Sequence, residues 1–217
     1  PDITQREMAK NMDISLGTVN GLVKECLAEG YIAEEENGKE KHLILLEKGK
    51  ELLKPYKVDG ALIIAAGFGS RFVPLTFETP KGLLEVFGER MIERQIKQLH
   101  EVGIYDITIA VGYLKEKFEY LIDKYDVKLL YNPEYSCKNT LATVYRARKF
   151  LKGRNVYILS SDNWMRENMY HSYECGAWYS AAHEEGETKE WCLTFNKKGR
   201  ISDVNVGGKD AWFMYGP

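Results

Sequence analysis

The sequence predicts an α/β fold with a doubly wound, mostly parallel mixed sheet, preceded by a small winged-helix domain. From residue 58 onward, short apolar runs alternate with segments of helical periodicity, which is typical of a parallel sheet covered by helices. Before residue 58, two helical segments lead into a hairpin pattern. Every Phe and Trp also lies after residue 58, so the composition changes where the predicted architecture changes.

The boundary between the two parts is predicted within the segment 54–60, where Pro55 and Gly60 supply the residue types of a short linker. We therefore expect a winged-helix domain at residues 1–57 and a second domain at residues 58–217.

The composition excludes several classes of protein. The 217 residues are 44% hydrophobic and 29% charged, which excludes a disordered or fibrous chain. No apolar run reaches the roughly eighteen residues of a membrane span, and the N-terminus lacks a signal-peptide pattern. We therefore expect a cytoplasmic protein with no membrane partner. The net charge of -2 gives no overall attraction to nucleic acid, and the four scattered Cys fit neither a zinc site nor a disulfide framework.

Capping signals define the helices of the first domain. Thr4 followed by Glu7 three residues later predicts a capping box at the start of one helix. Ser15 predicts the cap of a second helix that ends near Gly30. The segments 31–36 and 40–45, joined by Asn37-Gly38, then predict a hairpin.

This part of the chain resembles the MarR-type winged helix-turn-helix family through Thr4 to Ala9, Ser15 with Thr18 and Val19, and Glu29 to Ile32. The resemblance implies that the domain begins after the family's first helix. It also implies DNA as a partner of residues 1–57, against the alternative that the module only packs or forms a homodimer. Few cations favour DNA here, because Lys24 is the only one on the expected recognition helix.

The sequence of the second domain predicts alternating strands and helices. Strands are predicted at residues 61–65, 107–111, 127–131 and 156–160, and helices at residues 91–103, 115–124 and 140–150. The apolar residues between Trp191 and Val206 predict further strands that join a mixed-sheet core. Ligands of such sheets bind at the carboxyl ends of the strands, so the residues that follow each strand are the candidate site.

A glycine-rich loop follows the first of these strands. Ala65-Ala66-Gly67-Phe68-Gly69-Ser70-Arg71 is followed at a distance by Pro80-Lys81. Glycines allow the backbone to approach a polyphosphate, and the two cations supply positive charge. The alternative is a glycine-rich turn with surface cations. The pattern is neither a P-loop nor a complete dinucleotide fingerprint.

The order G-x-G-S/T-R followed by P-K resembles the nucleotidyltransferase superfamily, and within it the LicC-type phosphocholine cytidylyltransferases. Further matching segments are Ile109 to Lys115, Tyr131 to Tyr135, Lys138 to Leu141, Ser161 to Asn163, and Glu190 with Trp191. The resemblance implies a Rossmann-like nucleotidyltransferase fold. It also implies transfer of CMP from CTP to phosphocholine, with Mg²⁺ as cofactor.

The resemblance also implies roles for individual residues. Arg71, Lys81 and Asp162 are the implied catalytic residues, and Asp162 is the implied Mg²⁺ ligand. The implied nucleotide-binding residues are Ala65, Ala66, Gly67, Phe68, Gly69, Ser70, Arg71, Gly112, Asn139 and Thr140. Asp162 and Asn139 have an alternative as simple helix caps.

Aromatic residues are the implied acceptor site, because a quaternary ammonium binds ring faces. Trp191 is the first candidate, Trp164 and Tyr179 are weaker candidates for the same site, and burial of Trp191 in the core is the alternative. The family's second metal-binding Asp is expected beyond residue 217, so the second domain lacks its C-terminal part, or Asp203 or Asp210 substitutes. A sugar 1-phosphate or aminoalkylphosphonate acceptor, or a DNA-binding regulator that senses a metabolite, remain open alternatives.

Overall fold

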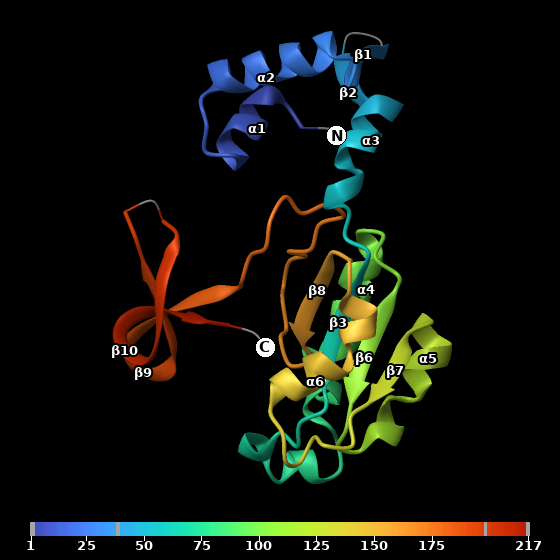
Figure 1. Cartoon of the computed structure of the whole chain (residues 1–217), viewed down its shortest axis with the longest axis vertical. Coiled ribbons are helices and arrows are strands. Elements are labelled where there is room, and N and C mark those ends of the chain that lie inside the picture. The colour runs from blue at the N-terminus through green and yellow to red at the C-terminus, as the bar shows by residue number, and fades with distance from the viewer. Residues whose placement is uncertain (1–2, 38–39, 198, 216–217) are drawn as a thin grey trace. The chain divides into compact units, whose positions relative to one another are not determined.

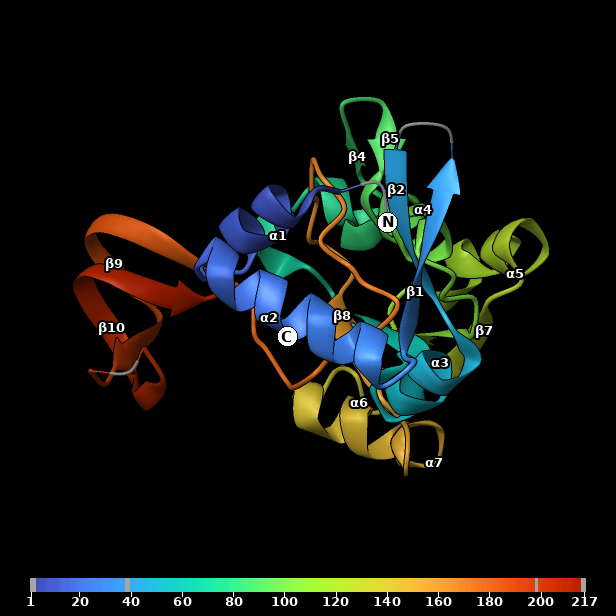
Figure 2. The same ribbon diagram turned by 90° about the horizontal axis from the view of Figure 1, so that it is seen from above.

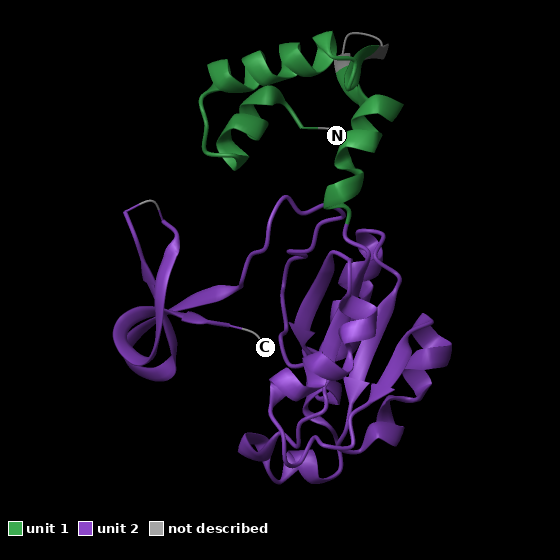
Figure 3. Cartoon of the chain, in the orientation of Figure 1, with its two compact units in different colours: residues 1–57 green, residues 58–217 purple. Residues whose placement is uncertain are grey.

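The computed structural model describes residues 3–37, 40–197 and 199–215. The chain divides into two compact units, residues 1–57 and residues 58–217 (Figures 1 and 3). Among the described residues, no helix combines the length and apolar character that crossing a bilayer requires.

The first unit contains two helices, a hairpin and a third helix. These elements are α1 (Gln5–Asn11), α2 (Leu16–Ala28), β1 (Ile32–Asn37), β2 (Glu40–Leu45), α3 (Glu47–Leu53) and η1 (Lys54–Tyr56). Both predicted caps are confirmed. Thr4 N donates to Glu7 Oε2 at 2.7 Å while Thr4 Oγ1 accepts from Glu7 N, and Ser15 Oγ accepts from Thr18 N at 3.0 Å.

The hairpin is antiparallel, with Ile32 opposite Leu45 and Asn37 opposite Glu40. The predicted Asn37-Gly38 turn falls partly outside the described residues. Helix α3 was not predicted, and its first residue follows Leu46 with no side-chain cap. At Gly49 a β-carbon would lie 2.3 Å from Tyr31 O, so α3 can pack this closely on the segment between α2 and β1 only because residue 49 is glycine.

The second unit is built on a four-stranded sheet. Its strands are β3 (Gly60–Ala65), β6 (Ile107–Val111), β7 (Lys128–Tyr131) and β8 (Val156–Ser160), in the order β7-β6-β3-β8. All three pairings are parallel. The strands match the predicted ones within about a residue, because each is a short apolar run between turn signals.

Helices cover both faces of this sheet, as Figure 2 shows for α4 (Met91–Glu101) on one side and α6 (Thr140–Arg146) with α7 (Arg148–Leu151) on the other. Alternate residues of β3 divide between two buried clusters. Ile63 packs with the apolar face of α4, and Leu62 packs with Ala147 and Phe150. The predicted doubly wound fold is therefore confirmed.

Two predicted helices are shorter than expected. The predicted helix 115–124 is a 3-10 turn, η5 (Lys115–Phe118), followed by α5 (Tyr120–Tyr125). The predicted helix 140–150 breaks at Ala147, which is 1% exposed between α6 and α7. The helical periodicity is the same on both sides of each break, so periodicity alone could not reveal them.

The prediction that the segment after Trp191 adds strands to a mixed sheet is wrong. Within the described part of the chain, β9 (Ala181–Phe195) and β10 (Ile201–Met214) pair only with each other, antiparallel and with several register shifts. Trp191 is 57% exposed and Val206 67% exposed, whereas Cys192 and Leu193 are buried, so only part of this run of apolar residues is covered. Charged residues interrupt both strands, which favours a solvated ribbon over a buried one.

Short elements fill the loop between β3 and α4. They are η2 (Ser70–Phe72), η3 (Leu75–Phe77), η4 (Lys81–Leu83), β4 (Glu85–Val86) and β5 (Glu89–Arg90).

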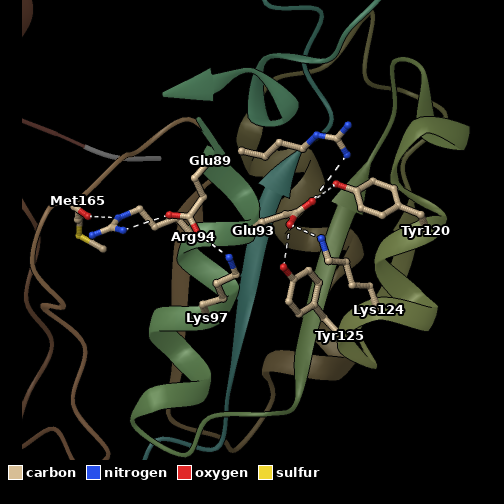
Figure 4. Close-up of polar contacts among 9 residues, drawn as sticks. Glu89, Glu93, Arg94, Lys97, Tyr120, Lys124, Tyr125 and Met165 are labelled. Carbon is tan, nitrogen blue, oxygen red and sulfur yellow. Dashed lines mark hydrogen bonds and ion pairs between the residues drawn. The ribbon is translucent and has the colours of Figure 1, made fainter. Parts of the chain in front are cut away.

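Glu93 ties α4 to α5. This carboxylate is only 7% exposed, and the side chains of α5 converge on it (Figure 4). Tyr120, Lys124 and Tyr125 each donate to it at 2.7 Å. Burial alone would raise the pKa of Glu93, but these donors reverse the shift and lower the pKa to about 2.

We expect Glu93→Gln to lower the free energy of unfolding at pH 7 by about 2–3 kcal/mol, because the donors lose a charged acceptor. The folded-state pKa of about 2 lies below the ordinary value of 4.5, so the carboxylate stabilises the fold above pH 4.5. That stabilisation disappears as the pH falls from 4.5 toward 2, and the difference between the two proteins should shrink over this range. Chemical denaturation at a series of pH values measures it.

Glu116→Gln, at an exposed position of η5, is the matched control and should change stability little at any pH. A pH-independent loss in Glu93→Gln would contradict the electrostatic explanation.

Candidate functional site

A cleft of about 360 Å³ lies at the carboxyl ends of β3 and β8, where the topology of the sheet places ligand sites. It is lined by Ile64, Ala65, Gly67, Gly69, Ser70, Arg71, Phe72, Lys81, Gly82, Thr140, Ser160, Ser161 and Asp162. Residues from the ends of two strands, the glycine-rich loop, η4 and the start of α6 thus share one cavity.

The glycine-rich loop is held in a fixed shape. Gly69 has φ +68°, which glycine adopts without strain, and a β-carbon there would lie 3.1 Å from Thr76 Cγ2. Thr76, fully buried, donates its hydroxyl to Gly69 O at 3.0 Å. At Gly67 a β-carbon would meet nothing within 4 Å, so this backbone faces open space in the cleft.

Lys81 and Asp162 form an ion pair across the cleft, with side chains only 21% and 24% exposed. Ser160 Oγ donates to the other oxygen of Asp162. Burial would raise the pKa of Asp162, but the bonds from Lys81 and Ser160 hold this pKa below its ordinary value. Asp162 is therefore a carboxylate at neutral pH. Lys81 Nζ also lies 4.5 Å from the centroid of the Phe72 ring.

Gly82 allows the two halves of this pair to meet. A β-carbon on Gly82 would lie 2.7 Å from Ser161 Cβ and 2.8 Å from Ser161 Oγ. Since Gly82 follows Lys81 and Ser161 precedes Asp162, this close approach sets the distance between the two charged side chains. Sequence reasoning missed Gly82, although a glycine directly after Pro80-Lys81 is a signal of close backbone contact.

The end of β6 forms a second close contact beside the glycine-rich loop. A β-carbon on Gly112 would lie 2.6 Å from Tyr135 Cβ, so this position requires glycine. Tyr113 N donates to Ala66 O at 3.1 Å, and the Tyr113 ring packs 4.6 Å from the ring of Phe68. Through Ala66 and Phe68 the loop thus contacts the residue that follows Gly112, and these three residues do not line the cleft.

The structure brings together most of the predicted phosphate-site residues. Ala65, Gly67, Gly69, Ser70, Arg71, Lys81, Thr140 and Asp162 all line the cleft. Asn139 occupies the N-cap position of α6, but its side chain makes no cap hydrogen bond. The alternative that Asp162 caps a helix is wrong, because none of residues 163–180, all of them described, is helical. Sequence reasoning assigned no site role to Ile64, Phe72, Ser160 or Ser161, although Ser161 lies in a segment that matches the family.

The three aromatic acceptor candidates do not line this cleft. Trp191 lies on β9 and is 57% exposed, so the alternative of a buried core residue is wrong. The guanidinium of Arg94 lies 4.7 Å from the centroid of the Trp164 ring, which it covers. Tyr179 is partly buried, and this burial raises the pKa of its hydroxyl.

The donor set around Asp162 fits a hard cation bound together with a phosphate. Mg²⁺ typically takes one or two carboxylates and completes its shell with phosphate oxygens and water. Among the described residues no group of three or more acidic, His or Cys side chains gathers, and among the residues that line the cleft Asp162 is the one carboxylate. Asp203 accepts from Val204 N at 2.9 Å and Asp210 accepts from Gly186 N at 2.8 Å, both within the hairpin, and neither lines the cleft.

Two family profiles match the chain. The profile described as "Nucleotidyl transferase" matches residues 60–185, and one described as "Winged helix-turn-helix DNA-binding" matches residues 1–33.

Curated relatives match the second unit. A choline-phosphate cytidylyltransferase of Streptococcus pneumoniae is 38% identical over 156 residues, covering 72% of this chain and 67% of the relative. A 2-aminoethylphosphonate cytidylyltransferase of Lancefieldella rimae is 36% identical over 158 residues, covering 72% of this chain and 64% of the relative. The chain therefore spans about two thirds of the length of these relatives.

Solved structures give the same picture. The structure of CTP:phosphocholine cytidylyltransferase from Streptococcus pneumoniae (LicC) aligns with a TM-score of 0.69 at 38% identity, covering 74% of this chain and 69% of that chain. A putative glucose-1-phosphate thymidylyltransferase from Bacillus anthracis aligns with a TM-score of 0.57 at 17% identity, covering 73% and 70%, and shows a shared fold.

We expect Gly82→Ala to lower the free energy of unfolding by about 1–3 kcal/mol, because the new methyl group overlaps Ser161. Ser161→Gly in the same chain removes both overlapping side-chain atoms and should restore part of the loss. Gly176→Ala is the matched control, since a β-carbon there meets nothing within 4 Å. Chemical denaturation of the four proteins checks this, and failure of Ser161→Gly to restore stability would contradict the proposed contact.

Proposed function

The chain belongs to the nucleotidyl transferase family, and on that premise we propose that it transfers CMP from CTP to phosphocholine, giving CDP-choline and pyrophosphate. The observation that carries this proposal is the ionised Asp162 paired with Lys81 beside a glycine-rich loop, in a cleft at the carboxyl edge of the sheet. The names of the two relatives that share 38% and 36% identity favour CTP as the nucleotide.

Charge placement is the main task of the protein in such a transfer. An oxygen of the acceptor phosphate attacks the α-phosphorus of CTP in line with the bond to the β-phosphate. The new P–O bond forms as the α–β bond breaks, and pyrophosphate leaves with the electron pair. Backbone N–H groups of Gly67 to Ser70 hold the phosphates, Arg71 binds the β- and γ-phosphates, and Lys81 neutralises charge at the α-phosphate.

Magnesium fits this arrangement as a cofactor held by Asp162. When bound, Mg²⁺ neutralises phosphate charge and polarises the reacting phosphoryl group. Ser160 orients the Asp162 carboxylate by donating to it, and Lys81 keeps it ionised.

The acceptor is the finer part of the proposal. Phosphocholine is favoured by the first relative and 2-aminoethylphosphonate by the second. Trp191 stays our candidate contact for a trimethylammonium group, because its ring is exposed and a quaternary ammonium binds aromatic faces. Trp164 is a weaker candidate, since Arg94 already covers its ring.

Pyrophosphate release from CTP with Mg²⁺ tests the proposal. We expect turnover with phosphocholine to exceed turnover with 2-aminoethylphosphonate and with glucose 1-phosphate.

Lys81→Ala should weaken CTP binding roughly tenfold or more, because a charge-assisted contact contributes about 1.5–3 kcal/mol. Lys117→Ala, at an exposed lysine of η5, is the matched control and should leave CTP binding unchanged.

Preference for another acceptor would correct the substrate while keeping the reaction. Absence of CTP binding by the unmodified chain would overturn the proposal.

DNA binding by residues 1–57 is a second candidate function, favoured by the winged helix-turn-helix match and by the two capped helices followed by a hairpin. The side chains limit its strength. Lys48 donates to Glu29 O at 2.7 Å, Lys50 pairs with Glu47 at 2.6 Å, and Lys54 pairs with Glu51. Neighbouring acceptors therefore compete with DNA phosphates for three of the nine Lys and Arg residues in this segment.

We therefore expect weak DNA binding with a shallow salt dependence, corresponding to fewer than about six phosphate contacts. Fluorescence anisotropy of a labelled duplex with the full chain, at a series of salt concentrations, measures the slope. A slope steeper than about -5 on a log–log plot would contradict this expectation.

A further inference from the structure

The segment that follows β8 is anchored to α4 by polar side chains. Gln98 Nε2 donates to Met165 O at 3.2 Å, and Arg94 donates to the carbonyl oxygens of Met165 and Arg166. Figure 4 shows Arg94 reaching from α4 to Met165. This segment carries Asp162 but contains no helix or strand, so contacts with α4 must fix its course.

Gln95 makes the contacts nearest to Asp162. Its side chain is 1% exposed, and its single amide nitrogen donates to Ser160 O at 2.9 Å and to Asn163 O at 2.5 Å. These two carbonyl groups flank Asp162 in the chain. Both hydrogens of the Gln95 amide are thus used to fix the backbone on either side of the carboxylate.

The opposite side of the same turn contacts η4. Gly82 approaches Ser161 closely, and Ser161 N donates to Ile64 O at 3.1 Å. The turn is therefore held from one side by β3 and Gly82 and from the other by Gln95. Because Gln95 is neither charged nor part of the cleft lining, it acts on the site only through the backbone it binds.

We propose that Gln95 is the positioning residue for Asp162, and that its amide fixes the carboxylate that would hold a divalent cation in the nucleotide cleft. The inference rests on the proposed function and extends it to a residue behind the cleft. An indirect partner of a metal-binding carboxylate typically affects metal affinity or activity by about 10–100-fold. A purely structural residue would change stability alone.

Gln95→Met provides the test, because methionine keeps the length of the side chain and removes both donors. Gln95 Oε1 is buried without a hydrogen-bond partner among the described residues, so its removal breaks no bond. Gln98→Met is the matched control: Gln98 lies on the same helix, is 4% exposed, and donates to Met165, three residues beyond Asp162. Gln95→Asn, which keeps the amide but withdraws it by one methylene, serves if Gln95→Met does not fold.

Three measurements are compared across these proteins, and thermal denaturation gives the first, the melting temperature. Titration calorimetry gives the affinity for Mn²⁺ in the presence of α,β-methylene CTP, and steady-state kinetics gives kcat and KM for phosphocholine. We expect Gln95→Met to lower Mn²⁺ affinity and kcat by about tenfold or more, with KM for phosphocholine nearly unchanged. Gln98→Met should lose similar thermal stability while its Mn²⁺ affinity and kcat stay within about twofold of the unmodified chain.

Equal effects of the two methionine variants, or an unchanged Mn²⁺ affinity in Gln95→Met, would overturn the positioning role while leaving the proposed function intact. If the unmodified chain bound neither the CTP analogue nor Mn²⁺, the proposed function would fail, and the inference with it.

Discussion

Parallel pairing of β3 with β6 on one side and β8 on the other is the constraint on which the rest of the second unit depends. The pairing brings the carboxyl ends of these strands to one edge, so that the glycine-rich loop after β3 lies beside Asp162 after β8. The connections must then cross the faces of the sheet as helices, which buries Leu62 on one face and Ile63 on the other. The cleft is a consequence of strand order.

Strand order alone does not make a reactive cleft, because the charged side chains must also be partly buried in it. Lys81 and Asp162 are about three-quarters buried, and an isolated charge in such a place would be costly. Each offsets the other, and Ser160 adds a further bond to the carboxylate. Such a pair contributes little net stability. Its role is to place two opposite charges where a ligand that carries both a phosphate and a cation can bind.

The sequence predicted the sheet and the phosphate loop well because both depend on local signals. The runs before Gly67 and before Asp162 are short and apolar, which predicts buried strands. Glycine and arginine directly after such a strand indicate a phosphate-binding loop. The helix breaks near Glu119 and Ala147 left no local trace. The ribbon of β9 and β10 was misread because alternating apolar residues such as Trp191 and Val206 specify a strand but not its partner. Gly82 and Gln95 were missed because their importance arises from contacts between segments distant in the sequence.

The sheet order also has a consequence for how the chain folds. β6 and β7 can pair early, since Thr108 and Lys128 are separated by a short crossover. The pairing of Gly60 with Val156 instead closes a loop of nearly a hundred residues, which carries the largest loss of chain entropy in the sheet. A nascent chain could therefore assemble β3, β6 and β7 around α4 while β8 is still being synthesised. Asp162 would pair with Lys81 only when β8, the last strand of this sheet, docks against β3. The cleft and the completed sheet would therefore form in the same step.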